Sequence, residues 1–156
     1  MISFFKHKDY PALELVKYES KHFDIHMRII KESFKIIPRG YIESVMHRGS
    51  EIVLIRSYGK IVGTFEVVDR NLRSFAILRK YRGKGIGTAV ITALLDRYGE
   101  ISIFGPSDDG RFLYRKFPHR IDYSDPRGEI WFLTDPKTSM LCDEIKKNEI
   151  YKVQMG

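Results

Sequence analysis

This sequence is poor in the residues and segments that define several large classes of protein. Its single cysteine, Cys142, excludes an internal disulfide framework and a zinc site built on cysteines. No apolar run approaches the roughly 20 residues of a membrane span, so we expect no membrane partner. The N-terminal segment, Met1 to Asp9, is too short and too polar for a signal peptide, and we therefore expect a cytoplasmic protein.

The charge of the chain is unbalanced. It has 27 Lys and Arg against 20 Asp and Glu, which gives a formal net charge of +7. Part of this charge suits a phosphate-bearing cofactor, and the rest would favour an anionic partner such as RNA or DNA. Solubility is the simpler explanation of the remainder, because the sequence has no accompanying nucleic-acid-binding motif. With 156 residues, the chain is long enough for one domain with a real core.

The most informative segment is a glycine-rich turn, Arg82-Gly83-Lys84-Gly85-Ile86-Gly87, between an apolar run and an amphipathic helix. Glycines let backbone N–H groups approach a ligand without interference from a Cβ atom. The start of a helix adds free N–H donors and the positive end of the helix dipole, which favour bound phosphate. Two further cations, Arg79 and Lys80, precede the turn. The segment therefore predicts a cradle for a pyrophosphate.

Two common phosphate-binding loops do not fit this turn. A Walker A loop has four residues between its first glycine and a Gly-Lys pair, but Gly83 is followed directly by Lys84 and Gly85. A dinucleotide-binding loop needs a third glycine three residues after its second. That position is Thr88 or Val90, depending on which glycine starts the count. The turn therefore belongs to a different class of loop.

The pattern that fits is Arg-x-x-Gly-x-Gly, formed by Arg82, Gly85 and Gly87. With its strand and helix, this segment resembles the acyl-coenzyme A binding motif of the GNAT acetyltransferase superfamily. The resemblance implies acetyl-CoA as the co-substrate, with its pyrophosphate on the loop amides and its pantetheine arm along the main chain at Ile77. Arg79 replaces a proline that the family often has. The implied cofactor-binding residues are Ile77, Leu78, Arg79, Arg82, Gly83, Lys84, Gly85, Ile86, Gly87, Thr88 and Ser107.

The order of elements agrees with the resemblance. Asp9 and Pro11 are interpreted as the start of a helix, and helical stretches are also predicted through Ile25 to Phe34 and over Tyr41 to His47. A hairpin is predicted over 51–68, and a strand over Leu72 to Leu78 leads into the glycine-rich loop. After the loop and its helix, the sequence predicts strands over 101–104, around 121–123 and over 129–133, with a short helix over 108–116. The implied fold is α/β (α+β), a mixed central sheet of about seven strands with a splayed parallel pair and about four helices. We expect a GNAT acyl-CoA-binding domain over 1–134. The C-terminal tail, 135–156, would pack as a helix or form a dimer contact.

A second segment, from Ser107 to Phe117, resembles the second cofactor motif of the family. Tyr114 falls on the tyrosine that protonates the coenzyme A thiolate in many members, so we predict it as the catalytic acid. Ser107 stands at an asparagine position, where it would either hydrogen-bond the pantetheine arm or cap the helix. Gly110 replaces a small alanine. The structural alternative for Tyr114 is a packed aromatic ring.

Acetyl transfer to an amine also needs a base, for which the sequence offers three candidates. Glu66 is the first, because strand alternation places it among apolar neighbours, where it is either solvent-facing or the base. Asp69 and His119 are the others, although members of the family that use water chains need no such residue. His22 and His26 are four residues apart, but no glutamate accompanies them in a metal-binding pattern, so we expect no metal.

The leading functional prediction is an acetyl-CoA-dependent N-acetyltransferase that moves an acetyl group to a primary amine by direct attack in a ternary complex. The acceptor stays open between a small molecule, a protein amine and aminoacyl-tRNA, and so does a homodimer. One alternative is a toxin-like GNAT protein that acetylates aminoacyl-tRNA. Another is a non-catalytic acyl-CoA sensor or binding module, and a nucleic-acid-binding protein is the third.

Overall fold

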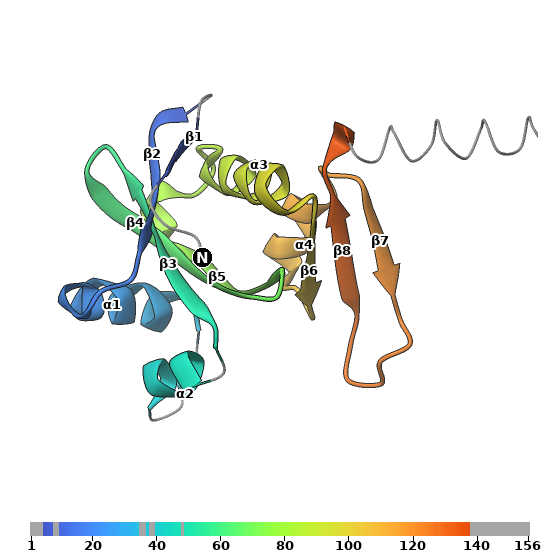
Figure 1. Ribbon diagram of the computed structural model, residues 1–156, viewed down its shortest axis with the longest axis horizontal. Helices are drawn as coiled ribbons and strands as arrows, with labels where there is room; N and C mark the ends of the chain where they lie inside the picture. The colour runs from blue at the N-terminus through green and yellow to red at the C-terminus, as the bar shows by residue number, and fades with distance from the viewer. Residues whose placement is uncertain (1–4, 8–9, 35–36, 38–39, 48, 138–156) are drawn as a thin grey trace, which may run out of the picture. The chain divides into compact units, whose positions relative to one another are not determined.

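The computed structural model describes residues 5–7, 10–34, 37, 40–47 and 49–137 and is shown in Figure 1. The chain divides into two compact units between Ala93 and Leu94. The first unit contains the glycine-rich loop, and the second contains the segment that resembles the second cofactor motif. Most of the predicted tail, residues 138–156 with Cys142, lies outside the described residues.

The first unit contains an antiparallel sheet in which the strands follow one another in sequence order. These strands are β1 (Phe5–His7), β2 (Tyr10–Lys17), β3 (Glu51–Ser57), β4 (Lys60–Val68) and β5 (Asn71–Ile77). The predicted hairpin is confirmed as β3 and β4. Its two-residue loop, Tyr58 and Gly59, has φ angles of 48° and 78°, and this positive pair suits the twist of a tight hairpin.

The predicted helix after Asp9 is wrong, because Tyr10–Lys17 forms strand β2. Leu13 and Leu15 are both buried, and this spacing of two residues is the period of a strand. Between them, Glu14 accepts a hydrogen bond from Arg56 of the neighbouring strand β3. Pairing with a strand about forty residues away determines the secondary structure of this segment. The residues that resemble a helix start carry no information about such a distant partner.

The predicted helices that follow are confirmed. A short 3₁₀ turn, η1 (Ser20–His22), leads into α1 (Phe23–Ser33), and α2 (Tyr41–His47) comes after it. Helix α1 buries His26, Ile29 and Ile30, which are three and four residues apart and therefore share one face. Ile29 packs against Ala76 and Leu78 at the end of β5, so α1 lies over the strand that leads into the glycine-rich loop.

Strand β5 contains a β-bulge close to that loop. Thr64 pairs with Ala76 and Glu66 pairs with Arg73, so two steps along β4 match three steps along β5. Ser74, inside the extra step, has a left-handed φ of 51°. A bulge interrupts the regular ladder and redirects the strand, and bulges are frequent beside functional sites.

The second unit has an antiparallel sheet in the order β6-β8-β7. Its strands, all predicted, are β6 (Glu100–Phe104), β7 (His119–Asp122) and β8 (Ile130–Thr134), and helix α4 (Asp108–Tyr114) precedes β7. Trp131 and Leu133 of β8 are buried in its core with Ile101 of β6. Helix α3 (Ile86–Tyr98) begins in the first unit and ends in the second. In the described part of the chain, no helix combines the length and the apolar character that crossing a membrane requires.

Candidate functional site

The glycine-rich loop joins the end of β5 to the start of α3. After Ile77 and Leu78, a 3₁₀ turn, η2 (Arg79–Tyr81), leads into the glycines, and α3 begins at Ile86. Gly83 and Gly85 have φ angles of 75° and 84°, a region that residues with a Cβ atom rarely adopt. The first N–H groups of a helix have no partner within the helix, so the loop leads directly to backbone donors at the start of α3.

Arg82 turns back from this loop toward the strand that precedes it. Its Nε atom donates a hydrogen bond of 2.8 Å to the carbonyl oxygen of Ile77, and its Nη2 atom reaches Ser33 Oγ of α1 at 3.4 Å. One side chain therefore links the loop, the end of β5 and α1. The motif analysis predicts that the pantetheine arm runs along the main chain at this same residue, Ile77.

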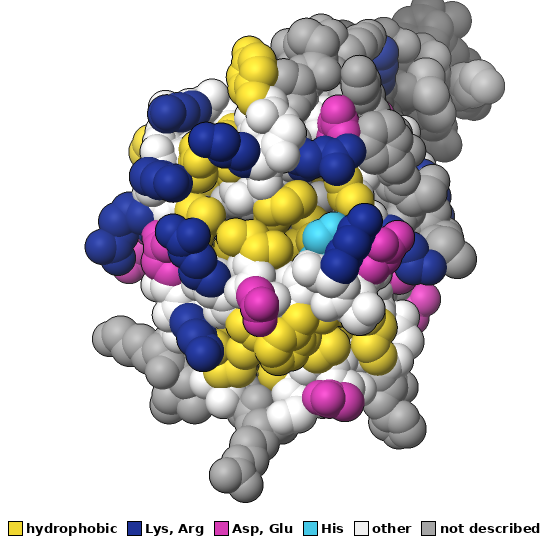
Figure 2. All heavy atoms as spheres, turned by 90° about the vertical axis from the view of Figure 1, so that its left-hand side faces the viewer, with side chains coloured by type: hydrophobic (Ala, Val, Ile, Leu, Met, Phe, Trp, Pro, Cys, Tyr) yellow, Lys and Arg dark blue, Asp and Glu magenta, His cyan; other side chains and the backbone are white. Residues whose placement is uncertain are grey.

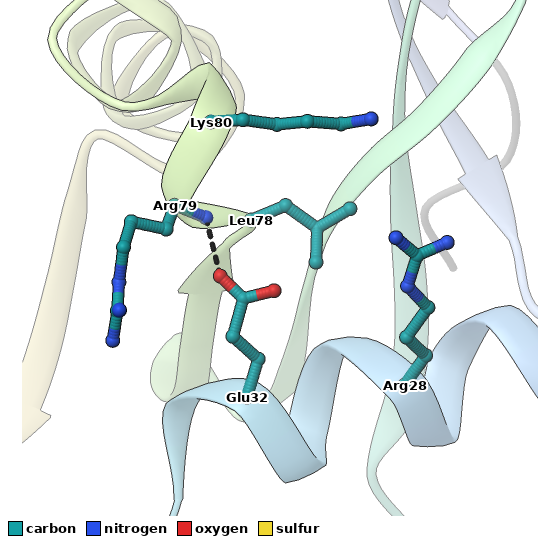
Figure 3. Close-up of a pocket in the computed structure, with 5 residues that line it drawn as sticks. All are labelled: Arg28, Glu32, Leu78, Arg79 and Lys80. Carbon is teal, nitrogen blue, oxygen red and sulfur yellow. Dashed lines mark hydrogen bonds between the residues drawn. The ribbon is translucent and has the colours of Figure 1, made fainter.

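A cavity of about 360 Å³ lies on the α1 side of the same strand end. It is lined by Arg28, Glu32, Leu78, Arg79 and Lys80 (Figure 3). The Arg79 backbone N–H donates a hydrogen bond of 2.6 Å to Glu32 Oε1. Proline, which the family often has at this position, has no N–H to donate. The departure from the family pattern thus adds a link between the loop and α1.

Glu66 is buried in β4, with only 2% of its surface exposed. The solvent-facing alternative for this residue is therefore wrong. Tyr41, at the start of α2, donates a hydrogen bond of 3.2 Å from its hydroxyl group to Glu66 Oε2. Asp69 lies in an exposed turn of the first unit, and His119 is exposed in the second. Of the three candidates for the base, Glu66 alone is removed from solvent.

His26 belongs to the same buried cluster as Tyr41. It is 1% exposed, its ring stacks on Tyr41 with centroids 6.2 Å apart, and its edge meets the ring of Tyr18 at 5.4 Å. Its Nδ1 atom is buried and has no hydrogen-bond partner among the described residues. Sequence reasoning missed this cluster, because Tyr41 and Glu66 carry no local signal that they meet.

His22 and His26 have different surroundings in the structure. His22 Nδ1 accepts a hydrogen bond of 3.0 Å from the Glu19 backbone, whereas the His26 ring packs between aromatic side chains. Within the described ranges, no group of three histidine, cysteine or acidic side chains has the arrangement of a metal site.

We expect His26 to make the protein less stable as the pH falls from about 6.5 to about 4. Burial lowers the pKa of His26 to about 4, whereas an exposed histidine in the unfolded chain takes up its proton near pH 6.5. The unfolded state therefore binds more protons in this window, and acidification costs up to about 3 kcal/mol of unfolding free energy. Urea unfolding of His26→Phe, which stays neutral, should lack this component. An unchanged slope of stability against pH in the variant would contradict the expectation.

In the second unit, Ser107 and Tyr114 mark the two ends of α4. Ser107 Oγ accepts a hydrogen bond of 3.1 Å from the Gly110 backbone, so Ser107 caps the helix, one of the two roles that the sequence left open. Tyr114 is 4% exposed, and burial raises the pKa of its hydroxyl group to about 12. A Cβ atom on Gly110 would come within 3.1 Å of the Tyr114 ring, so a larger residue at that position would crowd the ring.

Several solved structures share the fold of this chain. One is an acetyltransferase of Salmonella typhimurium that modifies the N-terminal serine of 50S ribosomal subunit protein L7/L12, with 12% identity, a TM-score of 0.62, and coverage of 79% of this chain and 95% of that chain. Another is the ribosomal-protein-S18-alanine N-acetyltransferase of Escherichia coli, with 15% identity, a TM-score of 0.60, and coverage of 78% and 93%.

A third structure, the PaiA N-acetyltransferase of Thermoplasma acidophilum in complex with coenzyme A, has 16% identity, a TM-score of 0.56, and coverage of 78% and 98%. No curated protein matches the sequence. The model of the acetyltransferase (GNAT) family matches residues 15–103, which include the glycine-rich loop and Glu66. Because this match spans more than half of the sequence, the chain belongs to the GNAT acetyltransferase family.

Proposed function

We propose that this protein is an acetyl-CoA-dependent N-acetyltransferase whose acceptor is an amine of a protein. The observation that carries the proposal is the loop conformation, with left-handed Gly83 and Gly85 directly before the start of α3. Family membership adds the acetyltransferase class. The similar structures from Salmonella typhimurium and Escherichia coli modify a serine and an alanine of ribosomal proteins, which favours a protein amine here.

The loop and the strand before it would hold acetyl-CoA. The amides from Gly83 to Thr88 would receive the pyrophosphate, with the charges of Arg82 and Lys84 beside them. The main chain at Ile77 and Leu78 would receive the pantetheine arm. Ser107 Oγ accepts the Gly110 backbone N–H and so caps its own helix, and we therefore propose a supporting role for it rather than direct contact through its side chain.

Glu66 would act as the base for the acceptor. Its carboxylate takes a proton from the acceptor ammonium group, and the neutral amine then attacks the thioester carbonyl. The C–N bond forms, the C–S bond of acetyl-CoA breaks, and coenzyme A leaves as a thiolate. On the basis of the family resemblance, we propose that Tyr114 donates the proton that this thiolate takes up. No covalent intermediate with the protein is needed, since the amine attacks directly.

One observation weighs against each of two alternative functions, the acyl-CoA sensor and a protein that acts on nucleic acid. The absence of an obvious base in the sequence favours a non-catalytic acyl-CoA sensor, whereas the buried Glu66 with its Tyr41 donor offers a candidate base and so supports an enzyme. The sequence adds no nucleic-acid-binding motif to its basic composition, and an RNA acceptor would require binding that weakens steeply with added salt. Both remain distinguishable by experiment.

Calorimetric titration of acetyl-CoA at low and physiological salt tests the cofactor half of the proposal. We expect micromolar binding that survives added salt, because the loop binds the pyrophosphate through directed N–H groups as well as charge. Release of free coenzyme A thiol in the presence of peptides, with mass spectrometry of the peptide products, tests the acceptor half. Tight cofactor binding without transfer to any amine would instead support the sensor.

We expect Tyr114→Phe to lower kcat by roughly 10² to 10³ with little change in the dissociation constant for acetyl-CoA, because general acid catalysis contributes on that scale. The pKa near 12 keeps the proton on this hydroxyl group throughout the neutral range. Tyr123→Phe is the matched control, since Tyr123 lies in the same unit and is 69% exposed. Single-turnover rates that match the wild type would remove Tyr114 from the mechanism.

A further inference from the structure

The cavity on the α1 side of β5 has a lining in which positive charge exceeds negative charge. Of its five lining residues, three are cationic and one is acidic. Glu32 already accepts the backbone N–H of Arg79. Arg28 and the side chains of Arg79 and Lys80 form no ion pair within the described part of the chain, and Lys80 Nζ lies 5.1 Å from the Tyr81 ring centroid. Such a concave positive surface attracts anions.

The orientation of the side chains leaves two of the three cationic groups on the same side of the cavity. In Figure 3, Lys80 and Arg28 extend toward the same side of the cavity, with the Leu78 side chain between them, whereas the Arg79 side chain points the other way. The buried Leu78 therefore provides an apolar surface between one ammonium and one guanidinium group. Figure 2 shows Lys and Arg side chains around apolar surface on one face of the molecule.

The cavity and Glu66 lie on the same face of the sheet. Ala76 and Leu78 both contact Ile29 of α1, and Thr64 is paired with Ala76, which places Thr64 on the α1 side. Glu66 is two residues beyond Thr64 on the same strand and therefore faces the same way, in agreement with its bond to Tyr41 of α2.

The distance along strand β4 sets the spacing between the cavity and Glu66. The Leu78 backbone N–H donates a hydrogen bond of 2.8 Å to the carbonyl oxygen of Val62, four residues before Glu66 on β4. Four residues of a strand span about 13 Å, since each adds about 3.3 Å. In an extended acceptor whose amine lies at Glu66, the fourth or fifth residue would therefore reach the cavity.

We propose that the cavity between Arg28 and Lys80 binds an acidic side chain of the acceptor, about four or five residues from the amine that is acetylated. The proposal rests on the proposed function, because it takes Glu66 as the position of the amine. The cofactor pyrophosphate has its own cradle in the glycine-rich loop. A carboxylate also suits the cavity better than a phosphate dianion, because Glu32 adds a negative charge to its lining.

Three synthetic peptides of ten residues test the proposal. They share one sequence and a free N-terminal serine, and they carry at positions four and five either two glutamates, two glutamines or two lysines. For the wild type, we expect kcat/KM to be roughly tenfold higher for the glutamate peptide than for the lysine peptide, because two exposed ion pairs contribute an effect of this size. A fourth peptide with the glutamates at positions nine and ten should lose this advantage.

The double variant with Arg28→Glu and Lys80→Glu should reverse the order, so that the lysine peptide becomes the better acceptor. Lys31→Glu with Lys60→Glu is the matched control, because both lysines are exposed in the first unit, lie outside the cavity lining and give the same change in net charge. The control should keep the preference for glutamate, slightly weakened by the altered overall field.

Three results would overturn the proposal while leaving the proposed function intact. The first is equal acetylation of the three peptides by the wild type, and the second is an equal change of preference in both double variants. The third is at least tenfold weaker acetyl-CoA binding in the cavity variant alone, which would assign the cavity to a cofactor phosphate. If the wild type binds acetyl-CoA but acetylates no peptide, the proposed function and the acceptor site fail together.

Discussion

Replacing Gly85 with glutamate is expected to abolish measurable acetyl-CoA binding. Gly85 has a φ of 84°, where a residue with a Cβ atom is strained, and that strain costs roughly 1–2 kcal/mol. The new carboxylate would also stand at the predicted pyrophosphate position, and each lost charge-assisted hydrogen bond costs roughly 1.5–3 kcal/mol. Together these effects predict a dissociation constant raised by more than about 100-fold. Calorimetric titration measures it directly.

Gly59→Glu is the matched control for the strain. Gly59 also has a left-handed φ, 78°, but it lies in the β3–β4 hairpin turn with no atom within 4 Å of an added Cβ. Both variants should lose a similar amount of stability in urea unfolding, and only Gly85→Glu should lose the cofactor. Affinity within threefold of the wild type in Gly85→Glu would show that the loop does not hold the pyrophosphate.

Glu66→Gln is expected to lower kcat by roughly 100-fold or more while the affinity for acetyl-CoA stays within a factor of two, because general base catalysis contributes on this scale. The glutamine side chain has the same shape, and its amide oxygen can still accept the Tyr41 hydroxyl group. The loss would therefore reflect the missing proton acceptor rather than a disturbed fold. Steady-state kinetics with a saturating peptide acceptor measures kcat.

Two further variants separate catalysis from structure at this position. Glu43→Gln is the control, since Glu43 is exposed on α2 and makes the same chemical change outside the buried cluster. Tyr41→Phe keeps the carboxylate and removes its donor, so its kcat should fall less than that of Glu66→Gln. If Glu66→Gln keeps more than a tenth of the wild-type kcat, a water chain or another group takes the proton.

Much of the fold was predictable because its signals are local. The hairpin turn at Tyr58 and Gly59, the amphipathic face of α1 and the strands of the second unit each depend on residues close in sequence. Strand β2 was mistaken for a helix because Asp9 and Pro11 resemble a helix start. Its burial and its partner β3 depend on pairing across about forty residues.

By itself, the sequence indicated the family of this protein and predicted its cofactor loop. Glycines at Gly83 and Gly85 permit a backbone that other residues resist, and a helix that starts after them presents N–H groups wherever the chain then folds. Only the tertiary structure decided which acidic residue is buried and what surrounds it. Glu66 meets Tyr41 across 25 residues of sequence, and Arg28 reaches the cavity beside Lys80 from a different element. Such contacts follow from the packing of α1 and α2 on the sheet, and no local pattern encodes them.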